Sequence, residues 1–361
     1  MKKNSLRDIR QSELANTWIE RGENGIIYAC PRFGKIKVAV LIMEKIKPTS
    51  VLIAYPDKKI EQSWKDDFEK WDFDVNATFT THLSLHKYKD NKYDLVIIDE
   101  VHLLSEAQIE ACKDLLENND RVLGLTGTLS RWSENTLREG LGLRVVGRYS
   151  IERAIDEGIL PDYEIRIVKV PLDNKIVRQW KTKWMTEKKR FDSFMWVINK
   201  KEKEDGDVPF FLKLRIIDIL MGSLAKMNAT IALIKKYENE RILVFCGRTE
   251  IADKLGIPSY HSKSEDKELW DEFLVGDVNH MAVVKIGNTG ITYKPLSKVI
   301  INHFDSNSET LTQRVNRCMS MEYDNPDKKA IIYIISSTEQ IELRWLSKAL
   351  SMFEKNKIKY L

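Results

Sequence analysis

Short apolar runs alternate with helical patterns along almost the whole chain, and this alternation limits the fold more than any other feature. In the first part of the chain the apolar runs are 25–29, 51–55, 77–82, 93–99 and 121–126. Helical periodicity separates them, for example over 36–46 and 60–71. Because these runs are apolar at consecutive positions, both faces of each strand must be covered. The pattern therefore predicts a parallel sheet flanked by helices.

A second series of the same kind follows later in the chain. Its apolar runs are 242–246, 257–261, 281–286, 298–303 and 330–336, with helical patterns over 250–255 and 265–273 between them. Residues 338–353 form an amphipathic pattern that is typical of a core-packing helix. We therefore expect two α/β domains, residues 1–158 and 159–361, which is a usual size for a chain of 361 residues.

A segment of different composition, roughly residues 174–213, lies between the two series. It is rich in Lys, Arg and aromatic residues, and a helical spacing would put Trp180 and Trp184 on one face. Two interpretations remain open. The favoured one is a charged helix that buries its aromatic side chains on a domain. The other is a nucleic-acid contact through phosphates and base stacking.

Composition excludes several classes of protein. Cys30, Cys112, Cys246 and Cys318 lie far apart and form no CxxC pair, so we expect neither a zinc site nor thiol-redox chemistry. The first residues lead into charged positions, and we expect no signal peptide, no membrane-spanning run and a cytoplasmic location. The formal net charge of +4 permits a polyanionic partner without arguing for one.

A loop suited to phosphate binding follows the first apolar run. Residues 30–35 read Cys-Pro-Arg-Phe-Gly-Lys and precede a helical pattern, so backbone N–H groups of Arg32, Phe33 and Gly34 would point at an anion. Lys35 would reach the terminal phosphates. The usual pattern continues with a Ser or Thr hydroxyl that binds Mg²⁺, but Ile36 offers no oxygen. We therefore expect weakened nucleotide hydrolysis; the alternative is an ordinary turn between strand and helix.

Two carboxylates end the apolar run 93–99, in the sequence Asp99-Glu100-Val101-His102. At the carboxyl end of a strand beside a phosphate loop, Asp99 is placed to hold Mg²⁺ and Glu100 to polarise the attacking water. His102 is a candidate link to the rest of the domain. The alternative is a solvated strand end.

With these residues the chain resembles superfamily 2 helicases and translocases, specifically the compact DEAH-like type found in large phages and in restriction and repair enzymes. The resemblance covers nearly the whole chain and implies two tandem RecA-like domains with the nucleotide in the interdomain cleft. Residues 6–11 resemble the adenine-recognition element, with Gln11 in the adenine-binding role. Residues 29–35 resemble motif I, and residues 99–102 resemble motif II.

The other motifs of the family follow in the expected order. Residues 54–56 with Gln62 and Trp64 look like motif Ia, 125–128 like motif III, 244–248 like motif IV and 285–291 like motif V. By this resemblance the nucleic-acid contacts would be Pro56, Gln62, Thr126, Thr128, Gly247, Arg248, Thr289 and Gly290. Residues 313–317 resemble motif VI, which implies that Gln313, Arg314 and Arg317 face the nucleotide.

The resemblance implies an ATP-dependent enzyme that uses Mg²⁺ to move along, unwind or remodel nucleic acid. We expect DNA rather than RNA, contacts mainly through phosphates, a monomer, and protein partners in replication, repair or transcription. Two alternatives stay open. A degenerate nucleotide- or nucleic-acid-binding scaffold is suggested by Ile36, by Ser320 in place of an outer arginine finger and by Thr292 in place of an aspartate. The second alternative is an ATPase that remodels a protein–nucleic-acid complex without unwinding it.

Overall fold

The chain divides into two compact units, the first ending at Pro161 and the second beginning at Asp162. The computed structural model describes residues 5–180, 182–206, 208–264, 268–284, 294–321 and 328–361. Each unit contains a sheet whose paired strands all run parallel. The expected fold class, parallel sheets flanked by helices in two RecA-like units, is confirmed.

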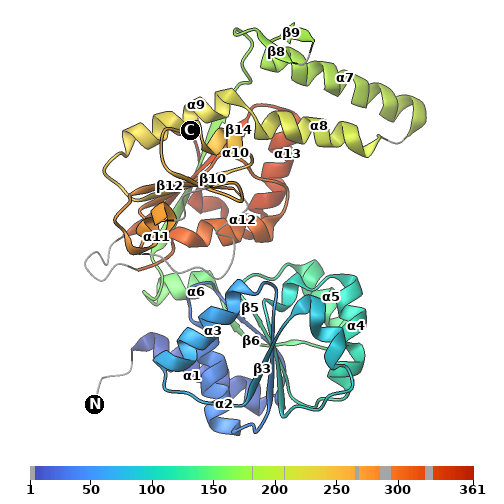
Figure 1. Cartoon of the computed structure of the whole chain (residues 1–361), viewed down its shortest axis with the longest axis vertical. Helices are drawn as coiled ribbons and strands as arrows, with labels where there is room; N and C mark the ends of the chain where they lie inside the picture. The colour runs from blue at the N-terminus through green and yellow to red at the C-terminus, as the bar shows by residue number, and fades with distance from the viewer. Residues whose placement is uncertain (1–4, 181, 207, 265–267, 285–293, 322–327) are drawn as a thin grey trace. The chain divides into compact units, whose positions relative to one another are not determined.

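The first unit has a doubly covered sheet. Its strands are β1 (Asn24–Ala29), β2 (Val51–Tyr55), β3 (Ala77–Thr81), β4 (Leu95–Asp99), β5 (Val122–Thr126) and β6 (Val145–Tyr149), in the spatial order β3-β2-β4-β5-β1-β6. Its helices are α1 (Leu6–Glu20), α2 (Lys35–Ile46), α3 (Lys59–Lys70), α4 (Glu106–Glu117), α5 (Arg131–Leu141) and α6 (Ile151–Asp156), with the 3₁₀ segments η1 (His82–Tyr88) and η2 (Val101–Leu103). Figure 1 shows α1, α2 and α3 on one side of the sheet and α4 and α5 on the other.

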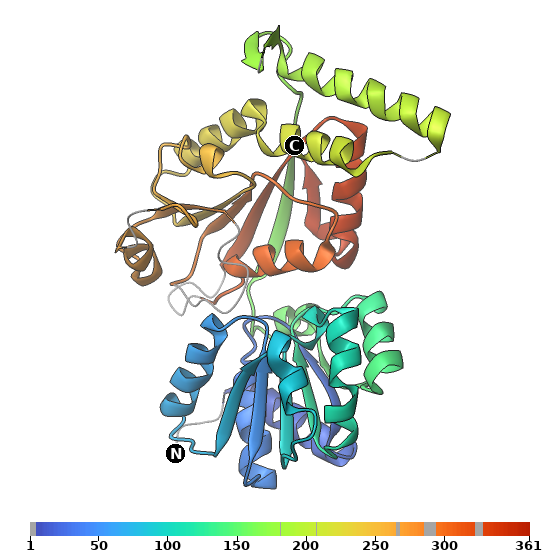
Figure 2. The same ribbon diagram turned by 45° about the vertical axis from the view of Figure 1, so that its right-hand side comes forward.

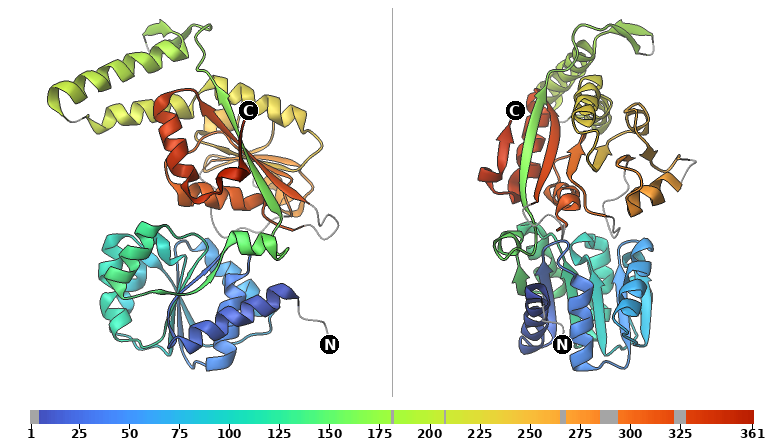
Figure 3. Two further views of the ribbon diagram at one scale, coloured as in Figure 1. Left: turned by 180° about the vertical axis from the view of Figure 1, so that it is seen from behind. Right: turned by 90° about the vertical axis from the view of Figure 1, so that its left-hand side faces the viewer.

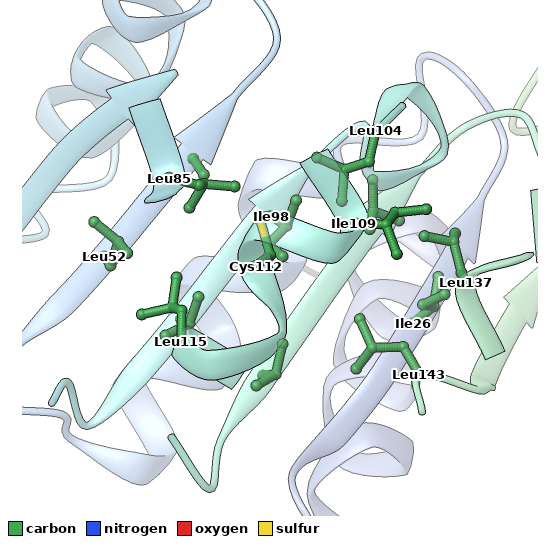
Figure 4. Close-up of a cluster of buried hydrophobic side chains, with 14 of the residues drawn as sticks. Ile26, Leu52, Leu85, Ile98, Leu104, Ile109, Cys112, Leu115, Leu137 and Leu143 are labelled. Carbon is green, nitrogen blue, oxygen red and sulfur yellow. The ribbon is translucent and has the colours of Figure 1, made fainter. Parts of the chain in front are cut away.

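Apolar side chains fix this arrangement from within. On the face covered by α4 and α5, Ile26 and Ile98 from the sheet pack with Cys112 and Leu115 from α4 and Leu137 from α5, all of them buried (Figure 4). Burying one such aliphatic side chain contributes roughly 1.5–3 kcal/mol relative to leaving it exposed. The strands are therefore held rigidly, and so are the residues that follow their carboxyl ends.

The second unit repeats the design with a longer sheet. Its strands are β7 (Asp162–Val170), β10 (Ile242–Cys246), β11 (Ser259–Tyr260), β12 (His280–Val284), β13 (Lys298–Ile301), β14 (Lys329–Ser337) and β15 (Ile358–Tyr360), in the spatial order β11-β12-β10-β13-β14-β7-β15. Its covering helices are α9 (Leu224–Lys236), α10 (Thr249–Ala252), α11 (Glu268–Val275), α12 (Ser308–Val315) and α13 (Gln340–Ala349), with 3₁₀ segments η3 (Asn316–Cys318), η4 (Leu350–Met352) and η5 (Lys355–Lys357). Figure 3 shows helices on both faces of this sheet.

The segment between the two series folds differently from the expectation. It forms a hairpin of β8 (Arg178–Trp180) and β9 (Lys183–Met185), followed by α7 (Glu187–Asp205) and α8 (Phe210–Met221). The prediction that Trp180 and Trp184 share a helical face is therefore wrong. Thr186 caps the start of α7 by accepting a hydrogen bond from the Lys189 N–H, so the helix begins only after both tryptophans.

The hairpin and α7 extend away from the sheet of the second unit, as Figure 2 shows. Apolar side chains of α7 and α8 pack together in a small core of their own, which includes Phe191, Ile198, Leu212 and Ile216. This core makes the segment a structured extension of the second unit, and it leaves Trp184 at 68% exposure.

One stretch contradicts the expectation that no run could span a membrane. Residues Phe210–Lys236 are long and apolar enough to cross a membrane, judged by length and composition alone. The stretch is nevertheless interrupted after Met221, and Ser223 caps α9 by accepting a hydrogen bond from the Lys226 N–H. Helix α9 then packs against β14 and β7. These contacts bury part of the stretch, while Phe210, Phe211 and Leu214 on α8 remain exposed.

Candidate functional site

Three neighbouring strands of the first unit end at the same edge of its sheet. Strand β5 lies between β4 and β1, so the chain segments after Ala29, Asp99 and Thr126 leave the sheet side by side. The carboxyl ends of parallel strands are the usual place for a ligand site in such folds. The phosphate loop, the acidic pair and the Thr126–Thr128 segment therefore belong to one site.

The loop after β1 has the backbone geometry that an anion site needs. Gly34 lies at the N-terminus of α2 with φ +95°, and no side chain caps the helix there. The first N–H groups of α2 are thus left without a capping side chain, and they carry the positive end of the helix dipole. Arg32 also has a left-handed backbone, with φ +66°, a conformation that glycine adopts more readily.

Gln11 holds this loop in place. Its buried side-chain amide donates a 2.7 Å hydrogen bond to the carbonyl oxygen of Phe33. A Cβ atom at Gly34 would lie 2.6 Å from Gln11 Nε2, so the residue at 34 must be small as well as left-handed. Phe33 packs against Tyr149 with ring centroids 4.4 Å apart. The adenine-binding role implied for Gln11 stays a prediction, and in this structure its contact is with the loop.

Lys35 turns from the start of α2 toward the acidic pair. Its Nζ atom lies 2.6 Å from Glu100 Oε1. Burial disfavours the charge on Lys35, yet the carboxylates of Glu100 and Asp99 outweigh that effect and raise the pKa of the lysine. A methyl group at Gly127 would lie 2.9 Å from Lys35 Nζ, so the glycine leaves room for the ammonium group.

The Asp99 carboxylate is buried and held by two donors. The Glu100 N–H donates to Oδ1 at 2.9 Å, and the Trp64 indole N–H donates to Oδ2 at 3.1 Å. Burial and the neighbouring Glu100 charge raise the pKa of Asp99 to about 6, while Lys35 opposes the shift. Burial alone would raise the pKa of Glu100, but the neighbouring Lys35 and His102 outweigh this effect and lower it.

These residues fit a magnesium ion with one protein ligand. A carboxylate has about four lone-pair directions, and two of those on Asp99 accept the N–H groups just described. Oxygen ligands are what Mg²⁺ requires, and it commonly retains several waters beside one or two carboxylates. Ile36 supplies none, so Asp99 is the residue that would hold the ion.

His102 connects the acidic pair to the segment after β5. Its Nδ1 atom lies 2.8 Å from Thr126 Oγ1 and 3.4 Å from Glu100 Oε2, while its Nε2 atom lies 3.0 Å from Thr128 Oγ1. The four side chains lie at or just after the carboxyl ends of β4 and β5. His102 thus contacts residues after both strands, and its role as a link to the rest of the domain stays a prediction.

Two buried partners of Asp99 were missed as site residues. The sequence places Trp64 only in motif Ia, and it gives His82 no role in the site. His82 Nε2 lies 2.9 Å from the backbone oxygen of Asp99, and burial lowers the pKa of its imidazole to about 4. A polar aromatic residue within an otherwise apolar pattern was the only sequence signal for either residue.

The expected nucleic-acid contacts of the first unit lie at the same edge of the sheet. Pro56 directly follows β2 and is partly buried, while Gln62 is exposed on α3 and donates a 2.7 Å hydrogen bond to Asp66. Thr126 and Thr128 are buried and bonded to His102. These two hydroxyls thus have an internal partner in this structure.

In the second unit, the expected residues lie at the ends of β10 and α12. Gly247 packs against His303, and the Arg248 guanidinium pairs with Asp218. Arg314 donates a 2.7 Å hydrogen bond to the backbone oxygen of His303, Arg317 is buried in η3, and Gln313 is partly exposed. Thr289, Gly290 and Thr292, with the rest of motif V, lie outside the described residues.

Comparison with known proteins agrees with this geometry. A family model described as the helicase conserved C-terminal domain matches residues 225–322. The DNA 3'-5' translocase XPB2 of the archaeon Sulfurisphaera tokodaii is 25% identical over 372 residues, which cover 91% of this chain and 80% of that protein.

Two solved structures have the same fold. They are the Hef helicase domain of Pyrococcus furiosus (TM-score 0.58, 13% identity, 96% of this chain and 98% of that chain) and a DEAD box protein from Methanococcus jannaschii (TM-score 0.51, 15% identity, 98% and 92%). The ordered motifs agree with three findings: the fold, the helicase family model that matches residues 225–322, and the relative that spans most of the chain. The chain is thus similar to superfamily 2 helicases and translocases over most of its length, and this similarity supports a nucleic-acid-dependent ATPase activity.

Proposed function

We propose that this protein hydrolyses ATP with Mg²⁺ and uses the energy to translocate along DNA. The observation that carries the proposal is the contact of Lys35 with Glu100, beside Asp99 and at the N-terminus of α2. Phosphoryl transfer needs an anion-binding helix end, an ammonium group, a carboxylate that holds the metal and a base, and this site supplies one of each. The similarity to the archaeal DNA 3'-5' translocase supports DNA as the track.

Each residue has a distinct part in the reaction. The N–H groups at the start of α2 and the Lys35 ammonium group would hold the phosphates, and Asp99 would hold the ion. A bound Mg²⁺ would neutralise charge on the transferring phosphoryl group. Glu100, whose pKa is lowered, is ionised at neutral pH and can accept the proton of the attacking water. Ile36 leaves the ion without a hydroxyl ligand, so we propose modest rather than fast turnover.

Phosphate release in the presence of different nucleic acids tests the proposal. Wild type and Lys35→Ala are assayed with single-stranded DNA, duplex DNA, forked DNA and single-stranded RNA. We expect stimulation of wild type by DNA above RNA, and no activity for Lys35→Ala. Equal wild-type rates with and without nucleic acid would overturn the translocase proposal. Strong stimulation by RNA alone would keep the motor and exclude DNA as its track.

Translocation is separable from unwinding. Displacement of streptavidin from DNA biotinylated at the 3' or the 5' end reports movement and its direction, and displacement of a paired strand reports unwinding. We expect ATP-dependent removal of streptavidin from the 5' end, as for a 3'-5' motor. No removal from either end by an active ATPase would favour the degenerate scaffold or the complex-remodelling alternative.

A further inference from the structure

The metal-holding carboxylate is held in place by a residue from a different part of the sheet. Trp64 lies on α3 with no exposed surface, and its Nε1–H donates to Asp99 Oδ2 at 3.1 Å. The opposite oxygen, Oδ1, accepts the Glu100 N–H at 2.9 Å. A donor on each oxygen restricts rotation of the carboxylate plane about the Cβ–Cγ bond, which a single donor would leave freer.

The tryptophan itself has little freedom to move. Its ring packs edge-on against Phe68, one turn along α3, at a centroid distance of 5.9 Å. Leaving a buried indole N–H without an acceptor would cost roughly 1–3 kcal/mol of folding stability. The hydrogen bond to Asp99 therefore restrains the Trp64 ring as well as the carboxylate. The donor therefore comes from a packed, rigid element.

The contact also leaves the carboxylate able to bind an ion. Two of its lone-pair directions accept N–H groups, and the remaining directions are available to a metal or its waters. Partners that hydrogen-bond a ligating carboxylate set its orientation, and removing them commonly weakens metal affinity 10–100-fold. The orientation of the Asp99 carboxylate matters more here, because Ile36 has no oxygen that could serve as a second protein ligand to the ion.

We propose that Trp64 is a positioning residue, which sets the orientation of the Asp99 carboxylate for Mg²⁺–nucleotide binding. The inference rests on the proposed use of Asp99 as the metal-holding residue. Its distinguishing feature is the indole N–H rather than the bulk of the ring.

The test replaces that N–H while keeping an aromatic ring in the core. Trp64→Phe is compared with Trp18→Phe as the matched control. Trp18 is also fully buried in the first unit and donates its indole N–H to an oxygen, the carbonyl of Gly25, at 3.2 Å. Both variants replace an indole with a smaller phenyl ring and lose one buried hydrogen bond, but only Trp64 contacts a carboxylate of the site.

Binding of a fluorescent ADP is titrated with Mg²⁺, so the readout does not depend on hydrolysis. We expect Trp64→Phe to raise the Mg²⁺ concentration for half-maximal binding roughly tenfold, while metal-free binding and the value for Trp18→Phe stay at wild-type levels. Equal Mg²⁺ requirements for the two variants would overturn the inference. If wild type binds Mg²⁺–ADP but shows no nucleic-acid stimulation, the translocase proposal fails while this test still stands.

A second measurement needs no change at position 64. The chain has nine tryptophans, and ¹⁵N labelling makes each indole N–H visible. The Trp18→Phe spectrum identifies the Trp18 signal. We expect Mg²⁺ added to the ADP complex to shift one slowly exchanging indole signal other than that of Trp18. A spectrum in which no indole signal responds to Mg²⁺ would overturn the inference even if Trp64→Phe does not fold.

Discussion

Lys35 Nζ lies 2.6 Å from Glu100 Oε1, so the lysine expected to bind phosphate and the carboxylate expected to activate water neutralise each other in this structure. Both side chains are mostly buried, which makes the pair strong and also makes a lone charge there costly. A nucleotide phosphate must therefore compete with Glu100 for the ammonium group.

This competition gives a prediction for Glu100→Gln. Hydrolysis should fall at least ~100-fold, because a general base is lost. Affinity for ATP should stay equal or increase, because Lys35 no longer has to leave a carboxylate. Single-turnover hydrolysis and calorimetric ATP titration measure the two effects separately. Lys35→Ala is the control and should lose binding. Weaker ATP binding by Glu100→Gln would contradict the competition.

Ile36→Thr should supply the missing hydroxyl ligand. The residue lies in the first turn of α2, directly after Lys35. We expect turnover to rise several-fold and the Mg²⁺ requirement to fall, since a second protein oxygen reaches the ion. Ile36→Val is the matched control, because it has the same branched shape without the hydroxyl. If Thr and Val behave alike with good basal activity, the site is already adapted to isoleucine.

His82 should make the protein sensitive to mild acid. Burial lowers the pKa of the folded imidazole to about 4 from an ordinary 6.5, so the unfolded chain binds a proton in this range and the folded chain does not. The contribution of the neutral His82 to the free energy of unfolding is therefore fully present above pH 6.5. It is lost as the pH falls toward 4, by as much as about 3 kcal/mol. Urea unfolding of wild type and His82→Gln between pH 7 and pH 4 checks this. Parallel pH curves for the two proteins would refute it.

Trp184 should contribute to nucleic-acid affinity. It is 68% exposed on β9, next to Lys183 on the same strand, and Arg178 lies across the hairpin. Stacking of a base on an exposed aromatic ring contributes about 1–3 kcal/mol. Trp184→Ala should weaken binding of single-stranded DNA accordingly, and Trp184→Phe should retain most of it. Fluorescence anisotropy at fixed salt measures both. Unchanged binding by the Ala variant would favour a purely structural hairpin.

A buried ion pair in the second unit should be sensitive to the loss of one partner. Lys226 Nζ lies 2.6 Å from Glu342 Oε1, both side chains are fully buried, and Glu342 Oε2 accepts the Ser337 N–H. Glu342→Ala should cost about 3–5 kcal/mol by leaving a lone ammonium group. Lys226→Met combined with Glu342→Leu should recover much of the loss, as chemical unfolding would report. A double variant no more stable than the single one would argue against the pair as the cause.

The first unit was largely predictable from sequence, for a physical reason. Its central strands are buried on both faces, so runs such as 51–55 are apolar at every position and end where polar residues begin. Asp99 and Glu100 could be placed because they directly follow such a run. Strand β6 was missed because it lies at the edge of the sheet and is partly exposed, so Arg148 interrupts its apolar pattern.

Long-range contacts could not be predicted in this way. The bond between Trp64 and Asp99 joins α3 to β4, and nothing in the spacing of the two residues shows which buried side chain faces which. The hairpin at 178–185 was mistaken for a helix for a different reason. Lys181 and Thr182 are not the Asn-Gly or Gly residues that mark a two-residue turn, and a four-residue interval between aromatics suits a helix as well.

The pairing of β7 with β14 has a consequence for how the protein is made. Asp162 opens the second unit, yet its strand pairs over its whole length with β14, beginning at Lys329, and then with β15. The first unit can close on the ribosome as soon as β6 has emerged. Strand β7 must instead wait, with both edges unpaired, until nearly all the rest of the second unit has been synthesised. During that interval the unpaired edges of β7 are open to pairing with other chains.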